Sequence, residues 1–274
     1  TEANNMVIWS MIYGNKKHII TSAVEHPAIL NVIEQLKPFG VSSTILPVNS
    51  EGQVNPKDLE ASIREDTGLV SIMMVNNEVG TIQPIKTLSE IAQNSNILFH
   101  SDSVQALGKI PLSVKELGAQ FLSFSGHKFY GPKGVGFLYC KKETKLNSLI
   151  IGGNQEENKR AGTENVAGIA GLGEAAKLIY ENLNKRMNHL IELEALFKDE
   201  VNKLNLSIVY NGDPNNHAPG LISISFPGNR SDILLAKLDR NGIELSNGSA
   251  CGSGITKPSP VLNAMGISDE DNLS

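Results

Sequence analysis

SFSGHKFYGPKGVG, residues 123–136, is the stretch from which the fold is best deduced. An apolar run over 119–124 leads into it, and a second apolar run over 135–140 follows. Both runs have the length of buried strands, and the residues between them are mostly small or turn-forming, so Lys128 lies at the mouth between two strands. A lysine in this place can present its amine to a cavity. Taken alone, however, the stretch is more typical of a surface lysine in a glycine-rich loop.

The composition narrows the class of protein. The chain has 274 residues, 40% of them hydrophobic and 19% charged, and a net charge of −5, which predicts a globular protein of one or two domains. Runs of Lys and Arg are short and aromatic residues make up only 5%, which argues against direct binding of nucleic acid. No apolar run approaches the roughly 20 residues of a membrane span, and no signal peptide opens the chain. We therefore expect a cytoplasmic protein with no membrane partner.

Cys140 and Cys251 are the two cysteines of the chain. They are too few for a disulfide framework and match no metal-binding spacing, so we expect free thiols in a reducing compartment and no metal site. The chain starts at Thr1 within what we interpret as a motif, and it stops at Ser274 after an acidic run. These ends predict a piece of a longer protein.

The first part of the sequence alternates apolar runs with amphipathic segments. The expected strands are 18–24, 41–48, 69–75, 97–102, 119–124 and 135–140, and the expected helices are 6–13, 28–37, 55–64 and 85–93. Continuous apolar strands separated by helices predict an α/β fold with a mainly parallel sheet covered on both faces. Ligands bind beyond the carboxyl ends of such strands. Asp102, where one strand stops, is therefore either a cap or a functional carboxylate that faces the same crevice as Lys128.

The pattern changes toward the C-terminus. A long amphipathic helix that can bend near Leu183 and Asn184 is expected over 166–204. Short strands are expected after it at 206–210, 221–226 and 243–245, around a helix at 232–241. These elements predict a large domain over 1–182 and a smaller α+β domain over 183–274, which carries a loop of small residues around Cys251.

A series of short motifs occurs in a fixed order along the chain. The motifs are TEANN (1–5), EHP (25–27), VNNEVG (75–80), SDSVQ (101–105), SGHK (125–128), RAGTEN (160–165) and GSAC (248–251). In this order and spacing they closely resemble the NifS/IscS-like cysteine desulfurases of the class-V aminotransferase family, over nearly the whole chain. The resemblance implies the aspartate-aminotransferase fold (fold type I) and pyridoxal 5'-phosphate as the cofactor.

The resemblance also implies a role for each matching residue. Lys128 matches the lysine that holds the cofactor as a Schiff base, and Asp102 matches the carboxylate that keeps the pyridine nitrogen protonated. His26 matches a histidine that stacks on the ring and is a candidate proton carrier. The remaining cofactor-binding matches are Asn77 and Gln105 near the phenolic oxygen, Thr1, Ser125 and His127 at the phosphate, and Thr163, which reaches the neighbouring subunit's cofactor. The last match implies a homodimer with shared active sites.

Cys251 matches the nucleophile of the family. Free cysteines are usually buried, but Ser, Ala and Gly around Cys251 offer little apolar cover, so the thiol can attack a substrate and then deliver its sulfur elsewhere. The resemblance implies that Lys128 takes the α-proton of L-cysteine and that the Cys251 thiolate attacks the substrate sulfur. A persulfide on Cys251 and free alanine result. A lowered thiol pKa or a nearby base such as His26 is expected, whereas Cys140, among apolar residues, is interpreted as structural.

The stretch after Cys251, residues 252–274, is long enough for the extended loop of the NifS/IscS-like group rather than the short loop of the SufS-like group. It favours sulfur delivery to an acceptor protein, such as an iron–sulfur scaffold or a carrier for tRNA thiolation. The family's first segment and its C-terminal arginine for the substrate carboxylate have no match here, which predicts weak or no activity for this chain alone. The alternatives are a selenocysteine lyase, another pyridoxal-phosphate-dependent elimination enzyme, or a non-catalytic truncated remnant.

Overall fold

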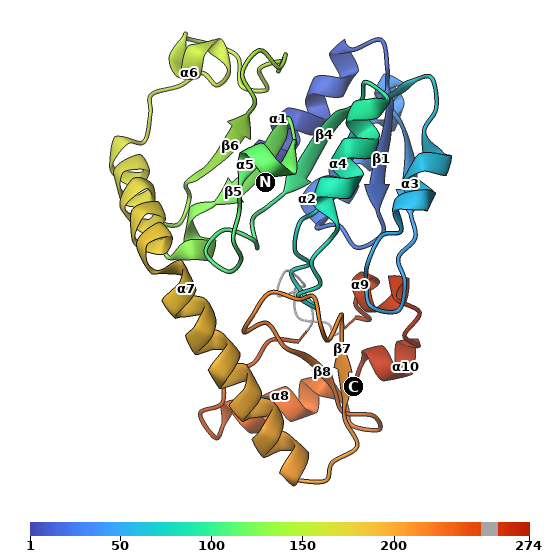
Figure 1. The fold of residues 1–274 in the computed structure, drawn as a ribbon, viewed down its shortest axis with the longest axis vertical. Helices are drawn as coiled ribbons and strands as arrows, with labels where there is room; N and C mark the ends of the chain where they lie inside the picture. The colour runs from blue at the N-terminus through green and yellow to red at the C-terminus, as the bar shows by residue number, and fades with distance from the viewer. Residues whose placement is uncertain (248–256) are drawn as a thin grey trace.

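A six-stranded sheet forms the centre of the larger part of the molecule (Figure 1). The structure is a computed structural model that describes residues 1–247 and 257–274. The strands are β1 (His18–Ser22), β2 (Ser42–Leu46), β3 (Thr67–Ser71), β4 (Leu98–Asp102), β5 (Phe121–Ser125) and β6 (Gly136–Cys140), in the order β2-β1-β3-β4-β5-β6. Neighbouring strands are parallel, except that β6 runs antiparallel to β5. The predicted α/β fold with a mainly parallel sheet is therefore confirmed.

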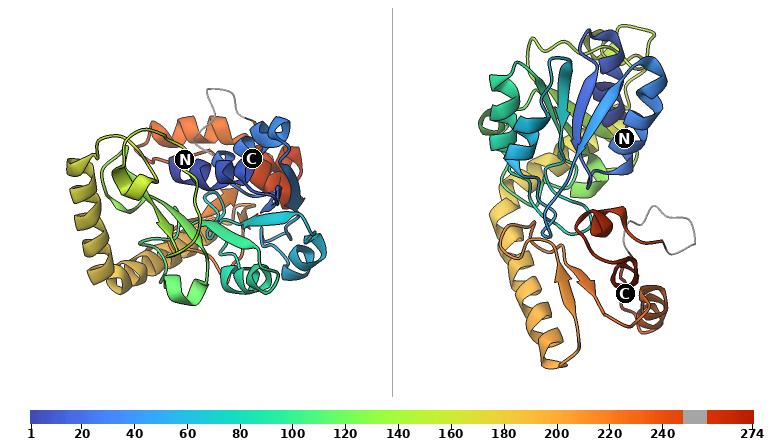
Figure 2. Two further views of the ribbon diagram at one scale, coloured as in Figure 1. Left: turned by 90° about the horizontal axis from the view of Figure 1, so that it is seen from above. Right: turned by 90° about the vertical axis from the view of Figure 1, so that its right-hand side faces the viewer.

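Helices cover both faces of the sheet (Figure 2). On one face lie α1 (Glu2–Trp9), followed by the 3-10 turn η1 (Ser10–Tyr13), and α2 (Pro27–Leu36), followed by η2 (Lys37–Phe39). On the other face lie α3 (Pro56–Ser62), α4 (Ile85–Asn94) and α5 (Val114–Leu117). Because both faces are covered, every residue of β1 and β3 is buried, which explains why their sequences carry apolar runs rather than an alternating pattern.

Two helix starts follow directly from local sequence. His26 caps α2, its Nδ1 accepting a hydrogen bond from the Ala28 backbone N–H at 3.0 Å, and Pro27 is the first helical residue. Asn55 caps α3 in the same way, followed by Pro56. Proline suits this first position because its fixed φ is already helical. It has no backbone N–H, but an N–H at this position would have no hydrogen-bond acceptor within the helix. Helix α2 therefore begins directly after His26, and the cap bond orients the His26 ring.

A single long helix links the sheet to the C-terminal elements. It is α7 (Val166–Lys203), 38 residues long, and it continues without a break through Leu183 and Asn184. Near its start, Leu172, Ala175 and Ile179 pack on the buried Phe129. Farther along, the Glu194 carboxylate accepts hydrogen bonds from Nε2 of His217 at 2.7 Å and from the Gly220 N–H at 3.0 Å. The helix thus contacts both parts of the molecule, and the predicted division at residues 182 and 183, which falls inside it, stays a prediction.

The C-terminal elements are short. They are β7 (Val209–Asn211) and β8 (Ser223–Ser225), which form an antiparallel pair, and α8 (Ser231–Asp239), α9 (Pro260–Ala264) and α10 (Asp269–Asn272). The strand expected over 243–245 is wrong. Ile243 and Leu245 are about half exposed and follow a turn after α8, and they pair with no strand among the described residues. An isolated extended segment without a partner has no ladder of hydrogen bonds to stabilise it.

Candidate active site at the carboxyl edge of the sheet

The candidate site residues come from segments that follow four neighbouring strands. His26 follows β1, Asn77 follows β3, Asp102 ends β4 and Lys128 follows β5. These strands are parallel, so their carboxyl ends meet at one edge of the sheet. Beyond β3, the N–H groups of Ile72 and Met74 still bond to β4, which carries the chain along the edge toward Asn77.

Asp102 is a buried carboxylate whose two oxygens both accept hydrogen bonds. Its Oδ2 receives Nδ2 of Asn4 at 2.6 Å, and its Oδ1 receives the N–H of Val104 at 3.1 Å. The side chain is only 6% exposed, so these bonds fix its orientation. Asn4 lies on α1, and its own Oδ1 is buried without a partner among the described residues.

Lys128 lies on η3 (Gly126–Phe129), a 3-10 turn directly after β5. The turn is closed by the N–H of Gly126, which donates to the Val135 carbonyl, and by the N–H of Gly131, which donates to the Gly126 carbonyl, both at 2.9 Å. Phe129 is buried against α7, whereas Lys128 is exposed. One residue therefore anchors the turn while its neighbour presents the amine.

His26 is half-buried and lies within electrostatic reach of both Asp102 and Lys128. Burial is the main cause that lowers its pKa, the Asp102 charge opposes this, and the Lys128 charge lowers the pKa further. The ring is consequently neutral around neutral pH. Since Nδ1 accepts the bond from Ala28, the proton of the neutral ring is assigned to Nε2. His26 can thus offer an N–H donor at Nε2.

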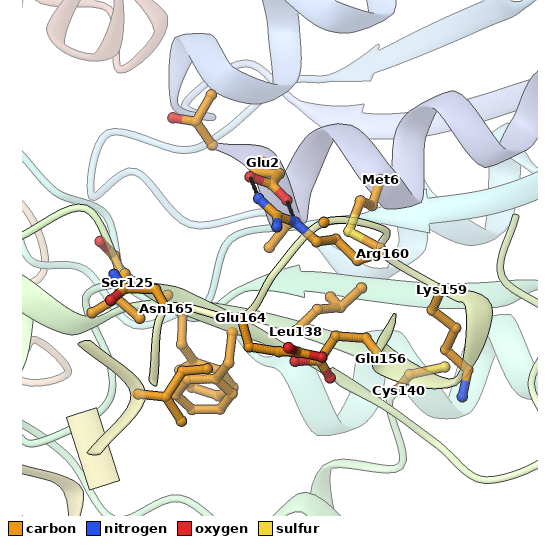
Figure 3. Close-up of a pocket in the computed structure, with 18 of the residues that line it drawn as sticks. Glu2, Met6, Ser125, Leu138, Cys140, Glu156, Lys159, Arg160, Glu164 and Asn165 are labelled. Carbon is orange, nitrogen blue, oxygen red and sulfur yellow. Dashed lines mark hydrogen bonds and ion pairs between the residues drawn. The ribbon is translucent and has the colours of Figure 1, made fainter. Parts of the chain in front are cut away.

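Three of the predicted phosphate ligands share one cavity of about 750 Å³ (Figure 3). Thr1, Ser125 and His127 all line it, and Ser125 Oγ lies 2.9 Å from Nδ1 of His127. Glu2 and Arg160 form an ion pair in its wall, with Arg160 Nε 2.8 Å from Glu2 Oε1. The hydroxyl and imidazole groups are neutral donors of the kind that bind phosphate.

The other predicted residues lie around this edge in different settings. Gln105 Oε1 accepts a hydrogen bond from Nζ of Lys109, whose pKa is lowered to about 8 by burial and by the Lys128 charge. Asn77 is half-buried. Thr163 is exposed on the segment before α7 and does not line the cavity. Cys140 does line it, and burial raises the pKa of its thiol.

Cys251 lies outside the described residues. The chain is described again from residue 257, and α9 then packs Val261 and Leu262 against Val24 and Met73 at the carboxyl edge. The Ser259 hydroxyl donates to the Glu78 carboxylate in the same region.

Three residues that contribute to this edge were given no role from the sequence. They are Asn4, Glu25 and Lys109. Asn4 and Glu25 lie within the motifs TEANN and EHP, so their positions were visible, but their partners are far away in the chain. Among residues 1–247 and 257–274, no helix is long and apolar enough to cross a membrane, and no group of three or more His, Cys, Asp or Glu could hold a metal ion.

The edge thus combines an amine, a fixed carboxylate, a neutral imidazole and a set of neutral donors. This set can hold a ligand that carries a cationic nitrogen at one end and an anion at the other. It can also move a proton between the ligand and Lys128 or His26.

Comparison with known proteins gives the family. The family model described as Aminotransferase class-V matches residues 1–268. The cysteine desulfurase IscS of Dictyoglomus turgidum is 49% identical over 270 residues, which are 97% of this chain and 68% of that protein. The cysteine desulfurase IscS of Clostridium botulinum is 44% identical over 275 residues, 98% of this chain and 69% of that protein.

Solved structures agree with the sequence relatives. A structure described as a NifS-like protein superimposes with a TM-score of 0.92 at 36% identity and covers 100% of this chain and 73% of that one. A NifS-like protein from Rickettsia africae gives a TM-score of 0.88 at 31% identity, over 100% of this chain and 72% of that one. The resemblance inferred from the motifs is confirmed, and the chain belongs to the class-V aminotransferase family, among its IscS/NifS-like cysteine desulfurases.

Proposed function

We propose that the protein is a cysteine desulfurase that transfers the sulfur of L-cysteine to its own Cys251 and releases L-alanine. The observation that supports this most directly is the carboxylate of Asp102, held by Asn4 and the Val104 N–H at the edge where Lys128 and His26 also lie. The relatives described above, which are cysteine desulfurases, favour this reaction among those that such an edge could serve.

The residues fit pyridoxal 5'-phosphate. A buried carboxylate with fixed orientation suits a protonated pyridine nitrogen, and Thr1, Ser125 and His127 provide donors for a phosphate in one cavity. We assign the covalent link to Lys128, and Asn77 and Gln105 to the phenolic oxygen. When bound, the cofactor supplies an electron sink for the substrate α-carbon.

The chain's own groups would then perform the proton transfers. The amine of Lys128, which is exposed on η3, would take the proton from the α-carbon. Neutral His26 can hold or give a proton at Nε2, because its Nδ1 is occupied by Ala28. The Asp102 carboxylate, oriented by Asn4 and the Val104 N–H, would pair with the cationic ring nitrogen of the cofactor.

The sulfur step belongs to Cys251. Its thiolate attacks the sulfur of the substrate, a sulfur–sulfur bond forms and the carbon–sulfur bond breaks. The carbon fragment keeps the electron pair, takes up a proton and leaves as alanine. The persulfide on Cys251 is then passed to an acceptor protein, for which we propose an iron–sulfur scaffold or a carrier for tRNA thiolation.

We further propose a homodimer with shared active sites. Thr163 supports this proposal, because it is exposed and lies outside the cavity that Thr1, Ser125 and His127 line. Thr163 is therefore better placed to contact the phosphate in the active site of a second subunit than the phosphate in the active site of its own subunit.

The test combines two readouts on the protein incubated with pyridoxal phosphate and L-cysteine. We expect Lys128→Ala to lose the visible absorption band of the bound cofactor. Cys251→Ser should keep this band and form no enzyme persulfide, measured by mass spectrometry, while alanine formation falls at least about a hundredfold. Cys140→Ser is the matched control and should keep both readouts. Wild-type alanine formation by Cys251→Ser would instead indicate a lyase that needs no thiol.

A further inference from the structure

Glu25 is a buried carboxyl group that the proposed reaction does not use. It is 4% exposed and directly precedes His26. Its Oε1 accepts two hydrogen bonds, from the Ser22 hydroxyl at 2.7 Å and from the Met73 N–H at 2.8 Å. Its Oε2 is buried and has no partner among the described residues. An ionised carboxylate in this setting would leave one charged oxygen unsolvated, which is costly.

Of the two bonds that Glu25 accepts, the one from Ser22 is local and the one from Met73 joins segments that are distant in sequence. Ser22 ends β1, whereas Met73 follows β3. A second bond acts in parallel, from Nδ2 of Asn76 to the Val24 carbonyl at 3.0 Å. Together they tie the turn that carries His26 to the segment that leads into Asn77. The spacing between these two proposed cofactor contacts therefore depends on Glu25.

The charges around Glu25 favour its neutral form. Burial raises its pKa to about 8, and the charge of Asp102, at the end of β4, raises it too, against the opposing effects of the bonds from Met73 and Ser22. Because Oε1 is the acceptor of both bonds, the proton of the neutral acid is assigned to Oε2. The side-chain charges that act on His26 are then those of Asp102 and Lys128.

We propose that Glu25 is a positioning residue: as a neutral acid it fastens the β1–α2 turn to the segment after β3, and so fixes the position and the charge environment of His26. The consequence for catalysis rests on the proposed desulfurase function. We call this link between the β1–α2 turn and the segment after β3 the Glu25 clamp. The clamp is a property of the folded chain without cofactor, so it can be measured in the cofactor-free protein.

The first experiment is an NMR titration of the cofactor-free protein. The imidazole signal of His26, assigned with His26→Asn, should show its own titration below pH 6.5 and a second step near pH 8, when Glu25 ionises beside it. In Glu25→Gln, which keeps an acceptor at Oε1 and cannot ionise, the second step should vanish. A second step that persists in Glu25→Gln, or one that is missing from the wild-type protein, would overturn the proposal.

The second experiment follows desulfurase activity and the visible circular dichroism of bound pyridoxal phosphate against pH. We expect wild-type kcat to fall above about pH 8 and Glu25→Gln to lack this fall, with kcat within about twofold of wild type at pH 7. Glu25→Ala, which removes the clamp, should lower kcat by about ten- to a hundredfold at every pH. An identical alkaline fall in wild type and Glu25→Gln would contradict the catalytic role. If the desulfurase proposal itself fails, the cofactor-free titration still decides on the clamp.

Discussion

Asp102 takes its orientation from a residue 98 positions earlier in the chain, Asn4. The bond from Nδ2 of Asn4 is short, and the only other donor to the carboxylate among the described residues is the backbone N–H of Val104. A buried carboxylate that loses one of its two donors is poorly solvated, and the loss costs about 1–3 kcal/mol. Asn4 is therefore expected to matter for stability and for the cofactor site together.

Replacement of Asn4 by Ala should lower the free energy of unfolding by about 1–3 kcal/mol and weaken the binding of pyridoxal phosphate about tenfold. Urea unfolding and titration of the visible absorption band measure the two effects. Asn5→Ala is the matched control, because Asn5 is next in sequence and bonds to the Thr1 carbonyl near the surface. Equal behaviour of the two variants would mean that Asn4 does not hold Asp102.

The sequence identified the reactive groups but not the residues that orient them. Lys128, Asp102 and His26 could be predicted because each follows a strand at a common edge, and a motif marks each one. The roles of Asn4 and Glu25 depend on which distant segments meet, and no local pattern records that Asn4 will face Asp102 or that Glu25 will face Met73. Lys109 was missed for a different reason, because its lowered pKa arises from burial and from Lys128.

At the scale of elements, η3 and α7 approach so closely that only glycine fits between them. A Cβ atom on Gly126 would lie 2.9 Å from Leu172 Cδ1 of α7 and 2.9 Å from the Val135 carbonyl oxygen. The side chain of Leu172 can yield a little, but the carbonyl belongs to the backbone that closes the turn. The position of Lys128 therefore depends on this contact.

Gly126→Ala should lower the free energy of unfolding by about 1–3 kcal/mol and reduce the fraction of protein that forms the cofactor absorption band. Gly173→Ala, on α7 where a Cβ would meet nothing within 4 Å, serves as the control. It should leave the band unchanged and raise stability by up to about 1 kcal/mol, because alanine favours helix. Thermal unfolding and absorption spectra distinguish the two, and a normal band in Gly126→Ala would contradict the expected role of the contact.

Strands that pair with a neighbouring strand and pack against helices were predicted from the sequence, whereas a segment without a strand partner was wrongly predicted as a strand. Each of the six strands of the main sheet overlaps the apolar run that indicated it, because helices pack on both faces of the sheet. The bounds differ most for β3, which begins two residues before its predicted run, at Thr67, and β5 ends one residue after its run, at Ser125. The run over 243–245 has a similar composition, but no described strand pairs with it. Strand β3 ends at Ser71, although apolar residues continue to 75, because the chain there leaves β1 to follow β4 alone.

At the scale of the whole molecule, a buried histidine joins three strands of the sheet. His100 on β4 bonds to Ser71 Oγ of β3 at 2.8 Å and to Ser123 Oγ of β5 at 2.9 Å. Burial lowers its pKa from 6.5 to about 3. Because the folded pKa lies below the unfolded one, the unfolded chain takes up the proton first as the pH falls. The stability linked to His100 is complete above about pH 6.5 and is lost progressively toward pH 3.

His100→Gln should therefore flatten the acid side of the stability profile. Between pH 7 and pH 4.5 we expect the wild-type free energy of unfolding to fall by about 2 kcal/mol more than that of the variant, although the variant is less stable at pH 7. Urea midpoints at the two pH values provide the measurement. His189→Gln, which removes an exposed histidine of α7, is the control. Parallel slopes for wild type and His100→Gln would show that another group sets the acid stability.

The uninterrupted course of α7 has a mechanical consequence. Its contacts with Phe129 end at Ile179 and its bonds to His217 and Gly220 start from Glu194, about 22 Å farther along a helix that rises about 1.5 Å per residue. A continuous helix resists bending, so a displacement at one of these contacts is transmitted along α7 to the other. The turn that carries Lys128 and the segment between β7 and β8 are thus mechanically coupled through α7.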